Sequence, residues 1–129
     1  TKAAQIKEEC RMLSEDFGGV LPMEMDTLLT VPGVGRKIAN LLLGDIYGLP
    51  AIVADTHCIR ISERLGLTPE NEKRPEKVEF ALKALISPDK QSDFCHRMVL
   101  FGRDICSARA PQCDFCPLSA LCRFHGEKK

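Results

Sequence analysis

The sequence is poor in aromatic residues and has no surplus of charge. It contains no Trp and one Tyr, and aromatic residues make up 5% of its 129 residues, against 44% for hydrophobic residues as a whole. A core built from these residues is therefore mainly aliphatic. Lys and Arg together number 18, as do Asp and Glu, so the net charge is zero. This balance argues against a protein that coats a polyanion, although it is compatible with a local basic face.

Long hydrophobic runs are also missing. No apolar stretch reaches the roughly 18 residues of a membrane-spanning helix, and the first residues show no signal peptide. The seven cysteines are an odd number, which without a secretion signal fits a reducing compartment better than a disulfide framework. We therefore expect a cytoplasmic protein that does not contact a membrane. Its length allows one domain or two small ones.

Apolar residues recur with helical spacing along most of the chain, which predicts an all-α protein. The chain begins without Met, yet its first residues already have this spacing, and Gly18 and Gly19 are expected to end the first helix. Residues 51–54 are apolar enough for a strand, but we interpret this short stretch as a connector. The predicted helices span residues 2–16, about 24–30, about 35–47, 55 or 56 to 65, 75 to about 86, and about 90–105.

Several of these helices have a definite apolar face. In the helix at 35–47, one face carries aliphatic side chains and another carries Lys37, Asn40 and Gly44. Three cysteines lie on helical stretches and are expected to be small core residues; they are Cys10, Cys58 and Cys95. The expected apolar faces consist of Ala3, Ile6, Cys10, Leu13 and Phe17; Ile38, Leu42 and Ile46; Val78, Ala81, Leu82, Leu85 and Ile86; and Phe94, Met98, Phe101 and Ile105.

The other four cysteines fall within 17 residues, with the spacing Cys106-x6-Cys113-x2-Cys116-x5-Cys122. The sequence around them, ARAPQCDFCPLS, is too polar and too rich in proline for a core, so we interpret the thiols as metal ligands. Both a zinc ion and an iron–sulfur cluster accept four cysteine sulfurs. Zinc sites more often show two close pairs of cysteines and only one such pair is present, but the spacing alone leaves both alternatives open.

The stretch TVPGVGRKIAN places a proline and two glycines between two predicted helices. Gly33 and Gly35 permit backbone angles that other residues avoid. The turn leads its N–H groups into a helix N-terminus, where a phosphate can bind, so it can hold a nucleic-acid backbone without reading bases. A Gly-Val-Gly turn is common at helix corners, but Arg36 and Lys37 directly after it strengthen this interpretation.

Lys37 is open to three interpretations: a solvated surface lysine, a phosphate contact or a nucleophile. The last role requires the neutral amine, and a helix N-terminus and apolar neighbours both disfavour the charged form. Asp55, in the stretch VADTH, lies 18 residues later at the start of another predicted helix. Its simplest role is that of an N-cap carboxylate. A lysine and an aspartate at two adjacent helix starts could also face one cleft.

Together these segments resemble the endonuclease III family of DNA base-excision repair enzymes. LLTVPGVGRKIAN is similar to the family's helix–hairpin–helix motif, VADTH to the end of the loop that carries its aspartate, and the cysteine spacing to its iron–sulfur motif. The resemblance covers essentially the whole chain and implies the helix–hairpin–helix glycosylase fold. Residues 1–50 would form part of the six-helix domain, with the hairpin at about 24–47. Residues 51–129 would form the cluster domain, with its cysteine loop at 106–122.

The resemblance also implies an activity. The family removes oxidised pyrimidines as a bifunctional DNA glycosylase and AP lyase and cleaves the strand by β-elimination. Lys37 would be the nucleophile, Asp55 would stabilise positive charge on the sugar, and the cysteines would hold a 4Fe-4S cluster rather than zinc. The implied partner is double-stranded DNA with damaged bases or abasic sites, bound by a monomer associated with the bacterial nucleoid. The implied DNA contacts are Gly33, Val34, Gly35, Arg36 and Arg109.

Three features depart from the family pattern. Family members are longer at the N-terminus, so the resemblance implies a truncated chain that corresponds to their C-terminal portion and lacks part of the lesion pocket. The loop SARAPQ has one charged residue, Arg109, where relatives are more basic, and Ala54 replaces the common Val before Asp55. A non-catalytic DNA-binding fragment that keeps the hairpin and the cluster is the alternative function. A small electron-transfer or zinc protein unrelated to DNA ranks last.

Overall fold

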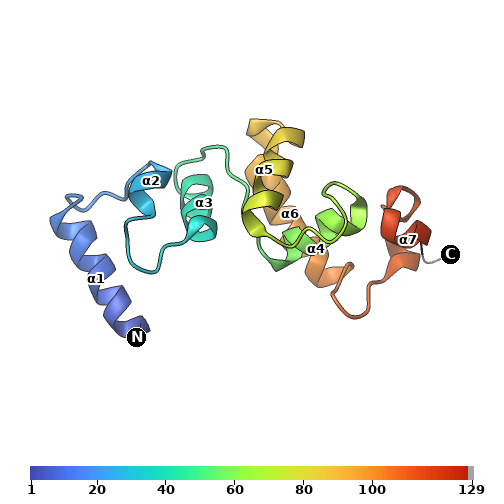
Figure 1. Cartoon of the computed structure of the whole chain (residues 1–129), viewed down its shortest axis with the longest axis horizontal. Helices are drawn as coiled ribbons and strands as arrows, with labels where there is room; N and C mark the ends of the chain where they lie inside the picture. Colours follow the sequence, from blue (N-terminus) through green and yellow to red (C-terminus); the bar gives the residue numbers. More distant parts are fainter. Residues whose placement is uncertain (128–129) are drawn as a thin grey trace. The chain divides into compact units, whose positions relative to one another are not determined.

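A computed structural model describes residues 1–127, and every regular element within this range is helical, as predicted (Figure 1). The chain divides into two compact units, Thr1–Leu49 (unit 1) and Pro50–Lys129 (unit 2). None of the helices in residues 1–127 has the length and apolarity needed to cross a membrane.

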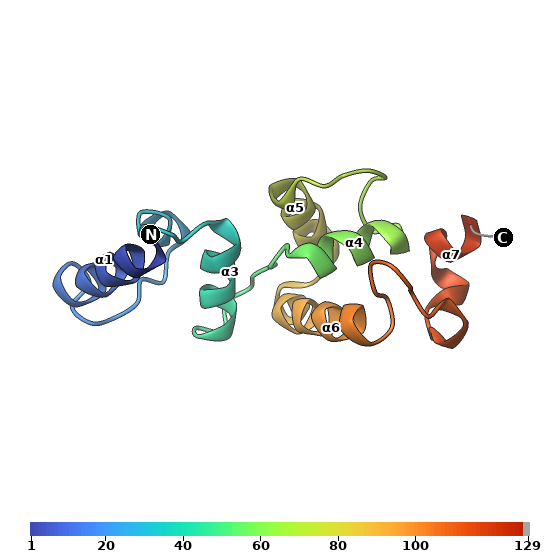
Figure 2. The ribbon, with the colours of Figure 1, turned by 90° about the horizontal axis from the view of Figure 1, so that it is seen from below.

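Unit 1 contains α1 (Lys2–Glu15), the short α2 (Met25–Leu28) and α3 (Arg36–Asp45). The hydroxyl of Thr1 caps α1 by accepting a hydrogen bond from the N–H of Ala4 at 3.2 Å. As expected, α1 ends just before two glycines with positive φ angles, at 18 and 19. Figures 1 and 2 show the segment between α2 and α3 as the turn that joins them.

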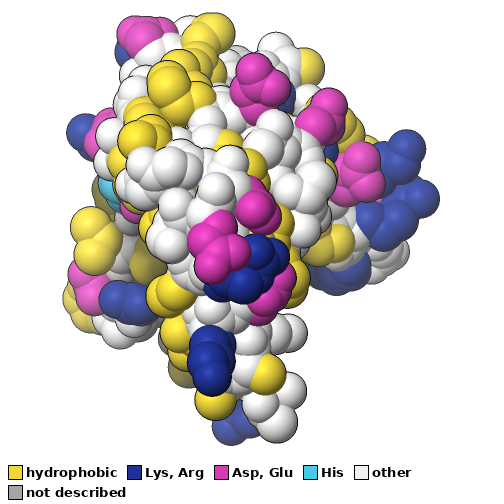
Figure 3. Space-filling model, turned by 90° about the vertical axis from the view of Figure 1, so that its left-hand side faces the viewer, with side chains coloured by type: hydrophobic (Ala, Val, Ile, Leu, Met, Phe, Trp, Pro, Cys, Tyr) yellow, Lys and Arg dark blue, Asp and Glu magenta, His cyan; other side chains and the backbone are white. Residues whose placement is uncertain are grey.

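The core of unit 1 is small. Its fully packed members are Leu28, Ala39 and Leu43, and none of the residues of α1 is buried. Ile6 is 59% exposed and Cys10 is exposed, so the prediction that Cys10 is a core residue is wrong. Hydrophobic side chains are visible among charged ones on the surface that Figure 3 shows. An apolar stripe on a helix predicts burial only where another element covers it.

The buried face of α3 also differs from the prediction. Asn40 and Gly44 are buried together with two core residues of α3, whereas Ile38 is 43% exposed and Ile46 is 58% exposed. Two of the three residues on the face that carries Lys37 are therefore buried. The predicted apolar face is largely accessible to solvent.

Unit 2 begins with the connector at 51–54, which is extended and mostly buried but forms no strand. Its longer helices are α4 (Thr56–Leu65), α5 (Pro75–Leu85) and α6 (Gln91–Asp104). Figures 1 and 2 show α4 packed against α6. A 3-10 turn (Pro88–Lys90) precedes α6, and α7 (Arg123–Glu127) follows two short 3-10 turns, Cys113–Phe115 and Ser119–Leu121.

The core of unit 2 joins the connector to α4, α5 and α6. It includes Cys58 and Cys95, which are buried as predicted, and the contact with Cys95 together with burial raises the pKa of the Cys58 thiol. Close packing of α6 on α4 depends on Gly102, since a Cβ there would lie 2.5 Å from Nδ1 of His57. The same cluster of buried residues contains Ile52, Ala54, Val78 and Leu82.

Two predicted faces in unit 2 are only partly correct. On α5, Val78 and Leu82 are buried, but Leu85 is 60% exposed. On α6, Met98 is buried, whereas the two phenylalanines and Ile105 are half-buried. The most buried side of α6 includes Cys95, Met98 and Gly102 and is adjacent to the predicted apolar face. The reason is that α4 packs against α6 at Gly102.

Candidate functional site

The turn between α2 and α3 requires a glycine at one of its two glycine positions. Gly33 has a φ angle of 82°, a left-handed conformation that side chains with a Cβ rarely adopt. A Cβ at this position would also lie 2.9 Å from Oε1 of Glu9 and 3.1 Å from Oε1 of Gln5. Because those two atoms are the ends of flexible side chains, the backbone conformation is the stronger reason for glycine at this point of the turn.

Gly35 is different, and our expectation about its backbone is wrong. It has φ −88° and ψ −179°, which any residue can adopt, and it is the N-cap residue of α3. A Cβ added there would meet no heavy atom within 4 Å among residues 1–127. Neither the backbone angles nor the described neighbours explain why this position carries glycine.

The start of α3 is suited to bind an anion. The first N–H groups of an α-helix have no acceptor within the helix, and the first such bond here runs from the N–H of Ala39 to the carbonyl of Gly35 at 2.9 Å. Gly35 has no side chain that could accept hydrogen bonds from the N–H groups at the start of α3. The partial positive charge of the helix N-terminus adds to this preference for negative charge.

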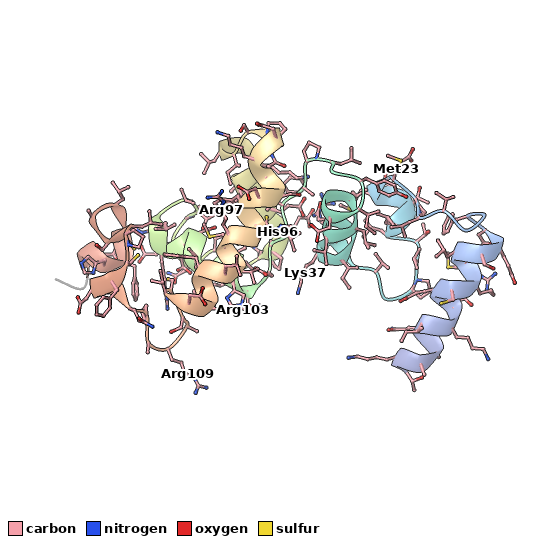
Figure 4. The ribbon with its side chains drawn as sticks, turned by 180° about the vertical axis from the view of Figure 1, so that it is seen from behind. Met23, Lys37, His96, Arg97, Arg103 and Arg109 are labelled. Atoms are coloured by element: carbon pink, nitrogen blue, oxygen red, sulfur yellow. The ribbon has the colours of Figure 1, made fainter. Side chains whose placement is uncertain are left out.

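Lys37 and Arg36 are the first cations after the turn. Lys37 is exposed, and Figure 4 shows its side chain extending from the first turn of α3. Arg36 is half-buried. Both residues belong to the first turn of α3 and directly follow Gly35.

Asp55 caps α4 at the start of unit 2, as predicted. Its Oδ1 accepts a hydrogen bond from the N–H of Cys58 at 2.8 Å, and its own N–H donates to the carbonyl of Val53 at 3.0 Å. The side chain is half-buried, so the carboxylate is fixed in position and still partly accessible. Lys37 belongs to unit 1 and Asp55 to unit 2.

The four clustered cysteines line one cavity in unit 2, together with apolar side chains that include Leu65, Phe101 and Phe124. Within residues 1–127, no three His, Cys, Asp or Glu side chains are grouped closely enough to hold a single metal ion. The four sulfurs of a tetrahedral zinc site lie about 3.8 Å apart, because each Zn–S bond is about 2.3 Å long. A 4Fe-4S cluster instead binds its four thiolates at four separate irons, so it does not need this close grouping.

Hydrogen-bond donors already point at two of these sulfurs. The N–H of Leu118 donates to Sγ of Cys116 at 3.4 Å, and Nη1 of Arg64 donates to Sγ of Cys106 at 3.2 Å. Such donors stabilise thiolate ligands in iron–sulfur proteins. Arg109 lies in the loop between the first two cysteines, and Figure 4 shows it projecting from the ribbon. The donor set therefore fits a cluster.

The sequence analysis missed two arginines of α4. Arg60 donates to the carbonyl of Cys106 at 2.9 Å and also contacts Nδ1 of His57 at 3.1 Å, while Arg64 binds the residues that follow Cys106. Their spacing of four residues puts them on one helix face. That spacing was visible in the sequence, but nothing local indicated that this face meets the cysteine loop.

Comparisons with known proteins find bacterial endonuclease III among the relatives of this chain. No family model matches the chain. Endonuclease III of Bacillus subtilis is 41% identical over 128 residues, which are 99% of this chain and 58% of that protein. The chain thus spans little more than half the length of the curated relatives that it matches.

Solved structures agree with the sequence comparison. A trapped endonuclease III–DNA covalent intermediate, an estranged-adenine complex, is 41% identical with a TM-score of 0.90, covering 98% of this chain and 59% of the other. A thermostable thymine-DNA glycosylase is 28% identical with a TM-score of 0.84, covering 97% of this chain and 58% of the other. The chain corresponds in sequence and in fold to the C-terminal portion of endonuclease III.

Proposed function

We propose that this chain, which belongs to the endonuclease III family, forms part of a base-excision repair enzyme that binds damaged double-stranded DNA, releases a base and cleaves the strand. The observation that carries this proposal is the start of α3. There, a glycine that the fold does not require leaves a helix N-terminus open beside an exposed lysine.

The first step is binding of the DNA backbone. In the turn from Gly33 to Gly35, the N–H groups of the two glycines would donate to a phosphate, whereas that of Val34 between them already donates to the carbonyl of Val31 at 3.1 Å. The absence of a side chain at Gly35 lets the phosphate approach these donors closely. Arg36 in the same turn and Arg109 in the cysteine loop would add cationic contacts to further phosphates. Such contacts position the protein without reading the base sequence.

The second step is chemistry at the sugar of a flipped nucleotide. The neutral amine of Lys37 attacks the anomeric carbon, forming a C–N bond as the glycosidic bond breaks and the base departs. The ionised carboxylate of Asp55 stabilises the positive charge that develops on the sugar. The covalent product becomes a Schiff base, and β-elimination from it cuts the strand on the 3′ side of the lesion. Oxidised pyrimidines are the proposed substrates.

The cysteine cavity completes the proposal. Cys106, Cys113, Cys116 and Cys122 would hold a 4Fe-4S cluster, whose iron–thiolate bonds would fix the loop that carries Arg109. This role is structural, because a loop with little regular structure needs cross-links to keep one shape. The four cysteines around one cavity and the two N–H donors aimed at sulfur support it.

Borohydride trapping on DNA with an abasic site tests the proposed chemistry. Reduction of the Schiff base leaves a stable protein–DNA adduct, and mass spectrometry of its peptides should locate the link at Lys37. Lys37→Ala should reduce the yield of adduct on the order of a thousandfold, because the nucleophile is gone. Lys7→Ala, which removes an exposed lysine from α1, is the matched control and should trap like the unchanged protein.

Two other outcomes would contradict parts of this proposal. Equal trapping after Lys37→Ala would show that Lys37 is not the nucleophile. A protein that binds the DNA duplex but never traps, and whose binding is unaffected by Asp55→Asn, would instead be a non-catalytic DNA-binding module.

A further inference from the structure

One side chain, that of Arg64 on α4, holds three consecutive residues at the start of the cysteine loop. Its Nη1 atom donates to the carbonyl of Ser107 at 2.8 Å and to Sγ of Cys106 at 3.2 Å, and its Nη2 atom donates to the carbonyl of Ala108 at 2.9 Å. A planar guanidinium can serve several acceptors in one fixed geometry, which a lysine cannot.

The same residue also contacts the far end of the cysteine loop. The guanidinium carbon of Arg64 lies 4.7 Å from the centre of the ring of Phe124, close enough for a cation–π interaction. Sγ of Cys122 lies 3.4 Å from the carbonyl oxygen of Arg64. Arg64 therefore touches the first and the last of the four clustered cysteines, one through its side chain and one through its main chain.

We propose that Arg64 is a positioning residue of the cysteine centre: it fixes the sulfur of Cys106 at the cavity, donates a charged hydrogen bond to that sulfur, and holds the loop that presents Arg109. This inference rests on the proposed function, in which the four cysteines hold a 4Fe-4S cluster. Donors to a ligating sulfur raise the reduction potential of such a cluster, and residues that orient ligands control how long the metal stays bound.

Three variants separate the charge of Arg64 from its geometry. Arg64→Met keeps the length of the side chain but removes every donor. Arg64→Lys keeps a cation near Cys106 but cannot serve the sulfur and two carbonyls in one plane. Arg97→Met is the matched control, because Arg97 is an exposed arginine of α6 that pairs with Asp93 at 2.8 Å, outside the cysteine loop.

The first two measurements follow the iron of the purified protein. In the presence of a chelator, Arg64→Met should lose its visible iron–sulfur absorbance at least about tenfold faster than the control, since residues that orient metal ligands typically change metal affinity by this factor. Its reduction potential should be more negative than that of the control. The reduction potential of Arg64→Lys should lie close to that of the control, because the positive charge sets it. Its rate of iron loss should remain close to that of Arg64→Met.

The third measurement, trypsin cleavage after Arg109, needs no metal. Without the two bonds to the carbonyls of Ser107 and Ala108 the loop opens more often, so cleavage should be several-fold faster in both Arg64 variants than in Arg97→Met. If Arg64→Met does not fold, Arg64→Lys and Phe124→Leu, which removes the ring beneath the guanidinium, provide the same comparison.

The outcomes distinguish this inference from the function on which it rests. Equal iron release, equal potential and equal cleavage in Arg64→Met and Arg97→Met would overturn the role of Arg64. If both Arg64 variants lose iron equally fast and have equally lowered reduction potentials, Arg64 only supports the fold. This result would overturn its direct action on the sulfur. An unchanged protein without iron would refute the proposed cluster, and the cleavage rates alone would then decide whether Arg64 holds the loop.

Discussion

The starts of α3 and α4 have almost the same backbone and different chemistry. Gly35 has φ −88° and ψ −179°, and Asp55 has φ −85° and ψ −178°. Asp55 caps its own helix, with the N–H of Cys58 donating to its carboxylate. Gly35 has no side chain and supplies no such cap to α3.

The comparison bears on why position 35 carries glycine. An aspartate adopts the same angles at 55, so the backbone does not require glycine at 35. A side chain there would meet no described neighbour. We propose that a ligand approaches this helix start, where a Cβ or a carboxylate would obstruct it. Asp55 already satisfies its helix and offers its carboxylate as a fixed charge.

The largest expected effect separates the two roles of Asp55. Asp55→Asn keeps an N-cap acceptor but loses the charge, so trapping should fall about a hundredfold or more while the free energy of unfolding changes by less than about 0.5 kcal/mol. Asp55→Ala loses both, and its free energy of unfolding should fall by about 1 kcal/mol. Denaturant unfolding and borohydride trapping measure the two quantities. Full trapping by Asp55→Asn would leave Asp55 with the capping role alone.

The next effect comes from making the start of α3 resemble that of α4. Gly35→Asp supplies the missing cap, so the helix should gain a few tenths of a kcal/mol. Its affinity for DNA should fall by more than about tenfold, since the carboxylate takes the donors and repels phosphate. Gly35→Ala should have an intermediate effect on affinity. Fluorescence anisotropy with a labelled duplex at fixed salt measures the DNA affinity of both variants.

Gly33→Ala is the contrasting change in the same turn. Its positive φ angle should lower the free energy of unfolding by about 1–2 kcal/mol. If Gly35→Ala were as destabilising as Gly33→Ala, or if Gly35→Asp bound DNA normally, the assignment of an external ligand to the start of α3 would be wrong.

The smallest expected effect concerns the stability of the fold at acidic pH. Glu63, near the end of α4, accepts hydrogen bonds from Lys73 and from the N–H of Asn71, and these contacts hold the pKa of its carboxyl below the ordinary value of 4.5. A lowered pKa stabilises the fold above pH 4.5, and this contribution is lost as the pH falls through the folded-state value. The stability difference between the unchanged protein and Glu63→Gln should therefore shrink between pH 5 and pH 3 in urea unfolding.

Much of the site could be predicted because its signals are local. The start of α4 follows from a side chain that caps a donor three residues away. The turn before Lys37 follows from glycines within one short segment, although only Gly33 uses the freedom that glycine provides. The cysteine spacing likewise indicated one centre, and the four cysteines do line one cavity.

The errors arose where burial depends on distant elements. Cys10 was expected in the core because its helix has an apolar stripe, but no described residue of α1 is buried. The wrong face of α3 was expected to pack, since periodicity ranks faces by apolarity and cannot tell which one meets a neighbour. Small residues such as Ala39 and Gly44 pack there because they allow close approach.

The sequence by itself determined the helical class, the order of the elements, the turn before Lys37, the cap at Asp55 and the group of four cysteines. Each of these depends on residues within a few positions of one another. The tertiary structure alone decided that Arg60 and Arg64 of α4 hold the loop at Cys106, more than forty positions away in the chain. Contacts of that kind depend on how α4 packs against α6 and the cysteine loop, and helical periodicity carries no record of this packing.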